Sequence, residues 1–478
     1  MARLTDLLPG LRLAANPEIT GTTCDSRKVR AGMLFAALPG SKADGRAFIA
    51  QAVAQGAAAI LAPLGTEIDT GAVPLVCVDN PRQAYARAAA ALAGAQPAVM
   101  VAVTGTNGKT STVNFARQIW AQLGHKAASL GTLGIVAPGW PTRPSLTTPD
   151  PTDLHAALAE LAADGVTHAA MEASSHGLDQ YRLDGVVLKA AAFTNLTRDH
   201  LDYHADMAAY GAAKLRLFNA LLPADGIAVV NADSDFAPQV LAAAGKALTF
   251  GRQGRDLRLL SATPDAHGQV LALEVLGRTV SVHLPLAGTF QAENALAALG
   301  LVIAAGADPV AATAALEHLQ GVPGRLQKVA ETAAGAPVYV DYAHTPDALE
   351  TVLRALRPHT RGRLVVVFGC GGDRDPGKRP QMGAIADALA DVAIVTDDNP
   401  RSEDPALIRK AILATCPHAT EIGDRAAAIR TAIAKAQAGD VVVLAGKGHE
   451  TGQTVKGVVL PFDDAEQARK AVSERGAA

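Results

Sequence analysis

The sequence predicts an α/β protein of three domains. Its 478 residues are about three times the ~150 residues of a typical domain. Short apolar runs alternate along the chain with polar or glycine-rich loops and with Ala/Leu-rich helical stretches, the pattern of largely parallel sheets. A glycine-rich loop between a strand and a helix begins shortly after Gln96. We therefore expect a small N-terminal α/β domain (1–95), a central P-loop domain with a parallel sheet (96–324) and a C-terminal Rossmann-like α/β domain (325–478).

The composition excludes several classes of protein. Hydrophobic residues make up 49% and charged residues 19% of the chain, which excludes disorder over most of its length. The formal net charge of −3 gives no positive field for nucleic acid. No apolar run approaches the ~20 residues of a membrane span, and the first residues do not form a secretory signal. These features favour a cytoplasmic protein that acts on small molecules.

The four cysteines support the same location. Cys24, Cys77, Cys370 and Cys416 lie far apart, and no CxxC occurs among them. This spacing argues against a zinc knot and against a disulfide framework. We expect four reduced thiols.

The first part of the chain is expected to hold a buried strand at 73–78 and a helix at 81–93. The sharpest domain boundary follows at Gly94-Ala95-Gln96-Pro97, just before an apolar run at 98–103. That run is the predicted first strand of the central part.

The loop Thr104-Gly105-Thr106-Asn107-Gly108-Lys109-Thr110 follows this strand and opens a predicted helix. Glycines let backbone N–H groups close around phosphate oxygens, and the helix N-terminus adds positive potential. The lysine can reach the β- and γ-phosphates, and the last threonine hydroxyl can bind Mg²⁺. The common pattern has a glycine where this chain has Val103, so only a shorter form of it remains. A chance match in a surface turn is the alternative, which the strand–loop–helix context disfavours.

Polar residues also follow two later strands of the central part, predicted at 169–171 and 190–194. Glu172 ends the first strand, and a polar run at 199–204 that includes His204 comes after the second. A carboxylate and an imidazole at neighbouring strand ends could hold Mg²⁺, although imidazole is not a ligand that Mg²⁺ favours. Lys214 lies in an apolar helical pattern. From composition alone, we expect a surface lysine whose aliphatic side-chain carbons lie along apolar neighbours while its ammonium group reaches solvent.

The last part of the chain gives the clearest α/β pattern. Strands are predicted at 338–340, 364–368, 392–395 and 441–444, and a charged loop follows each one. Ligands of open α/β sheets bind beyond the carboxyl ends of the strands. The four loops therefore predict one shared cleft, with ordinary solvated turns as the alternative.

Five segments together resemble the motifs of the Mur ligase family, the ATP-dependent amide-forming enzymes of peptidoglycan precursor synthesis. They are residues 104–112, 172–177, 200–204, 341–346 and 446–450. The resemblance covers essentially the whole chain and is closest to the MurE type, whose members add 2,6-diaminopimelate to UDP-N-acetylmuramoyl-L-alanyl-D-glutamate. The shortened phosphate loop is the family's own form.

The resemblance implies a reaction and its cofactors. The side-chain carboxylate of the D-glutamyl residue attacks the γ-phosphate of ATP, and the amine of the incoming amino acid then displaces phosphate from the acyl phosphate. The implied ATP site consists of Gly105, Thr106, Asn107, Gly108, Lys109, Thr110, Asn294, Arg325, Asp341 and His344. The implied Mg²⁺ ligands are Thr110, Glu172, His204 and Lys214, the last as a carbamate. The implied catalytic residues are Lys109, Glu172, His204 and Lys214.

The resemblance also implies two further substrate sites. The UDP-sugar substrate would contact Ser26, Ser41, Lys42, Ala43, Thr147, Thr148, Ser174, Gln180 and Arg182. Diaminopimelate would contact Arg374, Asp398, Asn399, Pro400, Arg401, Gly446 and Glu450. Arg401 is the specificity signal, because a guanidinium can clamp the carboxylate that distinguishes diaminopimelate from lysine.

Three alternatives stay open at this stage. Within the family, an L-lysine-adding MurE is the nearest, and Arg401 argues against it. A MurF-type enzyme that adds D-alanyl-D-alanine has no use for this arginine. Outside the ligases, a P-loop nucleotide-switch ATPase would hydrolyse ATP without an acceptor. We expect a monomer.

Overall fold

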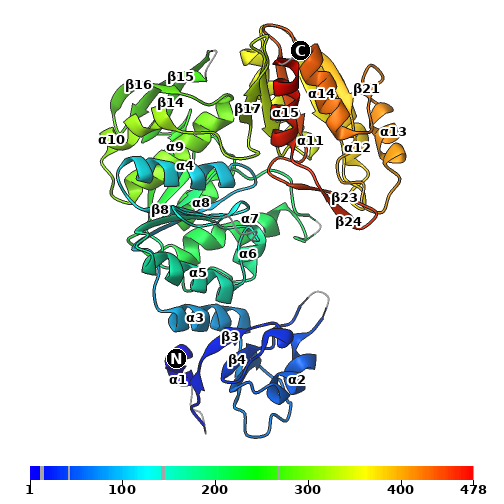
Figure 1. The fold of residues 1–478 in the computed structure, drawn as a ribbon. Helices are drawn as coiled ribbons and strands as arrows, with labels where there is room; N and C mark the ends of the chain where they lie inside the picture. The colour runs from blue at the N-terminus through cyan, green and yellow to red at the C-terminus, as the bar shows by residue number, and fades with distance from the viewer. Residues whose placement is uncertain (11–14, 41–42, 142–145, 202, 266–267, 477–478) are drawn as a thin grey trace. The chain divides into compact units, whose positions relative to one another are not determined.

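The computed structural model describes residues 1–10, 15–40, 43–141, 146–201, 203–265 and 268–476. The chain divides into two compact units (Figure 1). The first unit consists of residues 1–259, 274–278 and 294–315, and the second of residues 260–273, 279–293 and 316–478.

The N-terminal part of the first unit is built on a four-stranded parallel sheet of order β3-β4-β5-β6. The helix α3 follows it at Pro81–Ala93, as predicted, because the Asn80 side chain accepts a hydrogen bond from the backbone of Gln83 and Gly94 ends the helix in a left-handed conformation. The strand predicted at 73–78 is shorter than expected. The elements are β1 (Ala2–Arg3), α1 (Leu4–Leu7), β2 (Glu18–Ile19), β3 (Gly21–Thr23), η1 (Ser26–Lys28), β4 (Met33–Ala36), η2 (Gly45–Phe48), α2 (Ile49–Ala54), β5 (Ala59–Pro63) and β6 (Leu75–Val78).

The central part of the first unit holds a mostly parallel sheet. Its strands run in the order β14-β13-β12-β11-β7-β10-β8-β9, so the strand before the glycine-rich loop, β7, lies between β11 and β10. Every pairing from β14 to β8 is parallel, and only β9 is antiparallel to its neighbour. The strands are β7 (Val99–Thr104), β8 (Ala127–Gly131), β9 (Gly134–Val136), β10 (His168–Glu172), β11 (Ala190–Phe193), β12 (Ile227–Asn231), β13 (Lys246–Gly251) and β14 (Leu257–Pro264).

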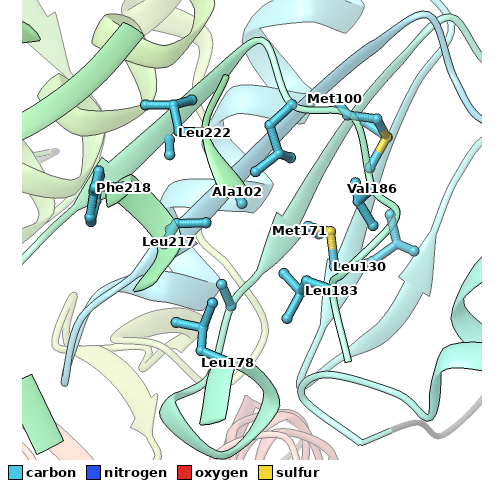
Figure 2. Packing of buried hydrophobic residues seen from close by; sticks show 14 of the residues in the cluster. Met100, Ala102, Leu130, Met171, Leu178, Leu183, Val186, Leu217, Phe218 and Leu222 are labelled. Atoms are coloured by element: carbon cyan, nitrogen blue, oxygen red, sulfur yellow. The ribbon is translucent and has the colours of Figure 1, made fainter. Parts of the chain in front are cut away.

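One face of this sheet is sealed by buried aliphatic side chains. Met100, Ala102 and Met171 of the strands belong to one buried cluster with Leu178 and Leu217 (Figure 2). Burial of this kind contributes about 25 cal/mol for each Å² of apolar surface removed from water. The core therefore fixes the strand ends from which the polar loops emerge.

The remaining elements between residues 109 and 318 are mainly helices, together with further strands. They are α4 (Lys109–Gln122), α5 (Pro151–Ala163), α6 (Ser175–Asp179), α7 (Met207–Arg216), the π-helical η3 (Leu217–Leu221), α8 (Ala237–Ala243), β15 (Gln269–Val275), β16 (Arg278–Leu284), α9 (Thr289–Ala304), α10 (Pro309–Ala314) and η4 (Ala315–His318). Among the described residues, no helix is long and apolar enough to span a membrane.

The second unit is built on a six-stranded sheet of order β17-β18-β22-β19-β20-β21, parallel except for β17. Side chains of α11 to α13 pack on one face, and side chains of α14 and α15 pack on the other. The elements are β17 (Gln327–Glu331), β18 (Pro337–Asp341), α11 (Pro346–Leu356), η5 (Arg357–His359), β19 (Leu364–Phe368), α12 (Lys378–Leu389), β20 (Val392–Val395), α13 (Pro405–Leu413), β21 (Thr420–Glu421), α14 (Arg425–Lys435), β22 (Val441–Ala445), β23 (Gly452–Val455), β24 (Val458–Pro461) and α15 (Asp464–Gly476).

The predicted fold class is confirmed. Helices cover both faces of the second sheet, which is the doubly wound arrangement expected of a Rossmann-like domain. The domain limits at residues 95 and 324 remain predictions.

Candidate functional site

The glycine-rich loop after β7 requires glycine at two positions. Gly105 and Gly108 have φ angles of +149° and +86°, which side chains other than glycine rarely adopt. A Cβ atom at Gly105 would overlap the Thr194 hydroxyl, and one at Gly108 would overlap the Asn294 side-chain oxygen. The structure thus places Asn294, one of the residues predicted to bind ATP, directly beside the loop.

The end of β11 holds the same loop from the other side. The backbone N–H of Thr106 donates to the carbonyl oxygen of Asn195 at 2.9 Å, and that of Asn107 donates to the Asn195 side-chain oxygen at 2.9 Å. The Thr194 hydroxyl donates to the Asn107 carbonyl oxygen at 2.6 Å. These bonds fix the loop backbone before any ligand binds.

Two lysine ammonium groups converge on one carbonyl of this loop. Lys109 Nζ lies 2.9 Å from the Gly105 oxygen, and Lys214 Nζ lies 2.8 Å from the same oxygen. Lys214 is buried, with 1% of its surface exposed. Burial, and then the charge of Lys109, hold the pKa of Lys214 well below its ordinary value. The surface position inferred from composition is therefore wrong: helix α7 points this lysine at the loop, and the amine is biased toward its neutral form.

Glu172 lies at the end of β10 with 1% of its surface exposed. Its Oε1 accepts the backbone N–H of Thr132 at 2.8 Å, and its Oε2 accepts the Thr132 hydroxyl at 3.3 Å. That hydroxyl lies 3.1 Å from the hydroxyl of Thr147. Thr132 therefore links the carboxylate to the segment that the resemblance assigns to the UDP-sugar substrate.

The other residues of that predicted substrate segment form one hydrogen-bond network. The Thr148 hydroxyl accepts from the Ser174 backbone and hydroxyl at 3.1 and 3.0 Å. Arg182 donates to the Thr148 carbonyl at 2.7 Å and to the Gln180 side chain at 2.8 Å. Residues up to 34 positions apart in sequence are thus brought together.

His204 is buried in a cluster of rings. Its ring centroid lies 5.7 Å from that of His176, 4.8 Å from that of Tyr203 and 5.2 Å from that of Tyr210. Burial raises the pKa of Tyr210 to about 12. Thr110 is also buried, in the first turn of α4. Among the described residues, no group of three or more His, Cys, Asp or Glu side chains is placed to hold a metal ion.

The N-terminal loop that contains Ser26 is held by its neighbours. The Asp25 carboxylate caps the short helix η1 and pairs with Arg27 at 2.8 Å, and these bonds lower its pKa to about 2. Ser26 is buried and Ala43 is exposed. Ser41 and Lys42 lie outside the described residues.

In the second unit, Asp341 ends β18 and is buried. Its two carboxylate oxygens accept the backbone N–H groups of Leu326 at 2.6 Å and Ala343 at 2.8 Å. Burial raises its pKa to about 6. The carboxylate fixes the chain reversal that begins at Gly324, where a Cβ atom would collide with the backbone of Gly448.

Aromatic rings surround the two other residues predicted here for nucleotide binding. The Arg325 guanidinium lies 4.8 Å from the centroid of the Tyr342 ring, and that ring lies 4.5 Å from His344 and 5.3 Å from His449. Nδ1–H of His344 donates to the Tyr342 carbonyl at 2.8 Å. Burial lowers the pKa of His344, so the ring is neutral near pH 7.

The loops after β20 and β22 meet at the carboxyl edge of the second sheet. Asn399 Nδ2 donates to Glu450 Oε2 at 3.0 Å, and Asn399 Oδ1 accepts the backbone N–H of Thr454 at 2.9 Å. Lys447 Nζ lies 3.7 Å from Asp398 Oδ1. A Cβ atom at Gly446 would lie 3.1 Å from Asp398 Oδ2. The predicted cleft residues are therefore neighbours in space.

Arg401 adopts a backbone conformation that is uncommon for residues other than glycine, with φ of +53°. Its Nη1 donates to the Gly372 carbonyl at 2.8 Å, and its backbone N–H donates to Thr454 at 3.0 Å. Arg374 lies on the loop next to Gly372 with its side chain exposed, and Pro400 is buried. Two loops thus carry one arginine each at the edge of the same sheet.

Several residues of these clusters were not among the predicted site residues. They are Thr132, Asn195, Tyr203, Tyr342 and Lys447. Asn195 and Lys447 lie in the polar loops after strands that the sequence had singled out, which is the signal that could have found them. Thr132 lies next to no comparable pattern.

Comparison with known proteins identifies the family. Three family models match the chain: "Mur ligase family, catalytic domain" at residues 18–93, "Mur ligase middle domain" at 103–302 and "Mur ligase, glutamate ligase domain" at 324–448. The UDP-N-acetylmuramoyl-L-alanyl-D-glutamate–2,6-diaminopimelate ligase of Caulobacter vibrioides is 59% identical, with 98% of each chain covered. The enzyme of the same name from Chelativorans is 56% identical over the whole of both chains.

Solved structures agree with these matches. A structure of a UDP-N-acetylmuramoyl-L-alanyl-D-glutamate–2,6-diaminopimelate ligase is 36% identical, covers 99% of both chains and has a TM-score of 0.75. The ADP complex of the MurF ligase from Thermotoga maritima has a TM-score of 0.63 at 19% identity, with 96% of this chain and 98% of that chain covered, and so shows the shared fold alone.

Proposed function

The chain belongs to the Mur ligase family, and we propose that it is the ATP-dependent ligase that adds meso-2,6-diaminopimelate to UDP-N-acetylmuramoyl-L-alanyl-D-glutamate. The names of relatives that are 50% to 59% identical over nearly the whole chain support this reaction. The observation that carries the choice of amino acid is the cluster of Asp398, Asn399, Arg401 and Glu450, which offers both a cation and anions to one ligand.

The first step is the activation of a carboxylate. A carboxylate is a poor acyl donor, so its oxygen attacks the γ-phosphorus of ATP, ADP leaves, and an acyl phosphate forms. Two anions must approach each other, which requires cations and N–H donors near the phosphates. Lys109 would supply the cation, and the backbone of residues 105–110 would supply the N–H donors. Hydrogen bonds of Thr194 and Asn195 with Asn107 already fix the conformation of this loop.

The residues of the first unit fit a Mg²⁺ ion that is bound largely by phosphate oxygens. Mg²⁺ usually takes one or two protein carboxylates and completes its shell with phosphate and water. Glu172 and the Thr110 hydroxyl would provide oxygen ligands, His204 would add a weaker one, and a carbamate on Lys214 would add a second anion. When bound, Mg²⁺ neutralises the phosphate charge.

Formation of this carbamate needs a neutral amine. The Lys214 nitrogen attacks CO₂, a C–N bond forms while one C=O π bond opens to a carboxylate oxygen, one proton passes from the nitrogen to water, and the product is an anion. The low pKa of Lys214 supports this step, since burial and the charge of Lys109 favour the unprotonated form. Burial and the charge of Lys109 also make a protonated Lys214 unfavourable at this position.

The second step joins the amino acid. Its neutral amine attacks the acyl carbon, a tetrahedral intermediate collapses, phosphate leaves, and the new amide remains. Arg401 would clamp the carboxylate at the far end of diaminopimelate, while Asp398 and Glu450 would receive its ammonium group. L-Lysine lacks that carboxylate and would leave the guanidinium unpaired.

The remaining assignments are part of the same proposal. Residues 1–95 would bind the UDP-sugar substrate together with Thr147, Thr148, Ser174, Gln180 and Arg182. Residues 96–324 would bind ATP, with Arg325, Asp341 and His344 of the following segment as further ATP contacts. Residues 325–478 would bind diaminopimelate. The four free cysteines support a reducing, cytoplasmic location, and we propose a monomer.

The test is phosphate release from ATP and Mg²⁺ with UDP-N-acetylmuramoyl-L-alanyl-D-glutamate and meso-diaminopimelate, L-lysine or no amino acid. Mass spectrometry identifies the product. We expect turnover and a new amide only with diaminopimelate. Turnover with lysine would retain the ligase and overturn the role of Arg401. Phosphate release that ignores the amino acid, without a new amide, would identify a nucleotide-switch ATPase.

A further inference from the structure

Lys447 is a fully buried lysine that the proposed reaction leaves without a role. It is 0% exposed, and it lies in the loop that follows β22. Its ammonium group lies 3.2 Å from Asn399 Oδ1, 3.4 Å from Glu450 Oε2 and 3.7 Å from Asp398 Oδ1. These neighbours are three of the residues predicted to bind the incoming amino acid.

The first consequence of this contact concerns the Asn399 amide. Its Oδ1 accepts from both Lys447 Nζ and the Thr454 backbone N–H. A flipped amide would turn its NH₂ group toward two donors and lose both bonds. The lysine therefore keeps Nδ2 of Asn399 on Glu450.

The second consequence concerns Glu450. Asn399 Nδ2 and Lys447 Nζ both contact the same carboxylate oxygen, Oε2. The other oxygen, Oε1, carries neither of these contacts and would be left to receive an ammonium group. The lysine thus sets which face of the carboxylate a ligand meets.

The third consequence is a balance of charge. Asp398 and Glu450 bring two negative charges to this loop cluster, and Lys447 cancels one of them. The charged residues predicted to bind diaminopimelate (Arg374, Asp398, Arg401 and Glu450) together with Lys447 carry a net charge of +1, from three cations and two anions. Diaminopimelate with a neutral attacking amine has a net charge of −1, whereas L-lysine in the same state has none. Opposite net charges favour the first ligand.

We propose that Lys447 is a positioning and specificity-determining residue: its ammonium group orients Asn399 and Glu450 and gives the cluster the net charge that selects a diamino dicarboxylic acid over a diamino monocarboxylic acid. The inference rests on the proposed function, since it takes the incoming amino acid as given. Lys447 touches the groups that hold the ligand, and it is not assigned a contact with the reacting atoms.

The test is Lys447→Met in the full-length enzyme, with steady-state constants for each substrate. We expect the KM for meso-diaminopimelate to rise about a hundredfold, because removal of one partner strands the buried carboxylates. The KM for ATP and for the UDP-linked substrate should stay within about twofold. The ratio of kcat/KM for diaminopimelate over L-lysine should fall about tenfold, since the charge difference that favours the dicarboxylic acid is lost.

Arg363→Met is the matched control. Arg363 forms a 2.6 Å ion pair with Asp440. Asp440 lies just before the start of β22, whereas Lys447 lies just after the end of the same strand. This variant removes a cation from the same unit without touching the ligand cluster, and its amino-acid preference should equal that of the unaltered enzyme. An equal fall in preference in both variants would show that Lys447 has only a structural role.

Lys447→Arg and Lys447→Gln keep the inference testable if the methionine variant does not fold. The arginine variant retains the charge and should keep the preference for diaminopimelate, while the glutamine variant should lose it. Unchanged preference in the glutamine variant would overturn the inference. If the unaltered enzyme itself does not use diaminopimelate, the proposed function fails instead, and the two failures are distinguished.

Discussion

The two units each bury a lysine at the end of a parallel sheet, and the surroundings give the two lysines opposite chemistry. Lys214 of the first unit donates to a carbonyl oxygen and lies in the field of a second lysine, so its pKa falls well below the ordinary value. Lys447 of the second unit forms ion pairs with two carboxylates. In the proposed reaction the first lysine acts as a nucleophile toward CO₂, and the second holds two carboxylates in place.

This difference shows that burial alone does not decide what a lysine does. Both side chains are at most 1% exposed. Removal from water disfavours the ammonium form of Lys214, which has no carboxylate of the described residues within ion-pair distance, whereas Lys447 lies beside two carboxylates. The groups that neighbour each lysine, which come from distant parts of the chain, therefore decide which chemical role that lysine can have.

The largest expected effect is at Lys214. Lys214→Ala should lower kcat about a thousandfold, because the proposed carbamate, which would complete the set of anionic ligands, cannot form. Lys214→Arg is the matched variant: it keeps a cation and should be equally inactive, since a guanidinium does not form a carbamate. Activity in the arginine variant near that of the unaltered enzyme would show that the charge, rather than the nucleophile, is what the first unit needs.

Arg401→Ala should have the next largest effect and sharpens the account of the second unit. We expect kcat/KM for diaminopimelate to fall about a hundredfold through the loss of the carboxylate clamp, with little change for L-lysine. Arg354→Ala, which removes an exposed arginine paired with Glu350 on α11, is the control and should change neither value. A uniform loss for both amino acids would contradict the specificity assigned to Arg401.

Asp341 provides a test through pH. Its pKa is raised to about 6 in the folded chain, from an ordinary value of 3.8, by burial. Between pH 4 and 6 the folded state keeps a proton that the unfolded state has lost, so stability falls as pH rises through this window and is level above it. Compared with Asp341→Ala, the unaltered chain should lose about 2 kcal/mol of relative unfolding free energy from pH 4 to pH 7. Urea unfolding at a series of pH values measures this, and a difference that does not change with pH would refute it.

The smallest expected effects are at two helix caps, one in each unit. Asp206 accepts the backbone N–H of Ala209 at the start of α7, and Asp404 accepts that of Ala406 at the start of α13. Replacement of either by alanine should cost about 1 kcal/mol of unfolding free energy. Thermal unfolding of the two variants measures the loss, and the cost should be similar in the two units because the local bond is the same.

Sequence reasoning succeeded where local patterns dominate. The strands at 364–368 and 392–395 were predicted with the observed limits, because buried parallel strands form continuous apolar runs. Helix α3 was also predicted with the observed limits, because Asn80, Pro81 and Gly94 are strong signals for its two ends.

The parts that sequence reasoning missed depend on contacts between distant segments. Composition placed Lys214 on the surface, whereas the carbonyl that it contacts lies 109 residues earlier in the chain. Lys447 contacts Asn399, which lies 48 residues earlier. The family resemblance placed Lys214 in the site. The polar loop after the predicted strand at 441–444 placed Lys447 near the cleft, but it gave no sign that this lysine is buried.

The most direct test of the contrast between the two lysines is carbon-13 NMR of the enzyme equilibrated with labelled bicarbonate. We predict one carbamate signal, which disappears in Lys214→Arg and remains in Lys447→Gln. The absence of a carbamate signal in the unaltered enzyme, or a signal that persists in Lys214→Arg, would contradict the account.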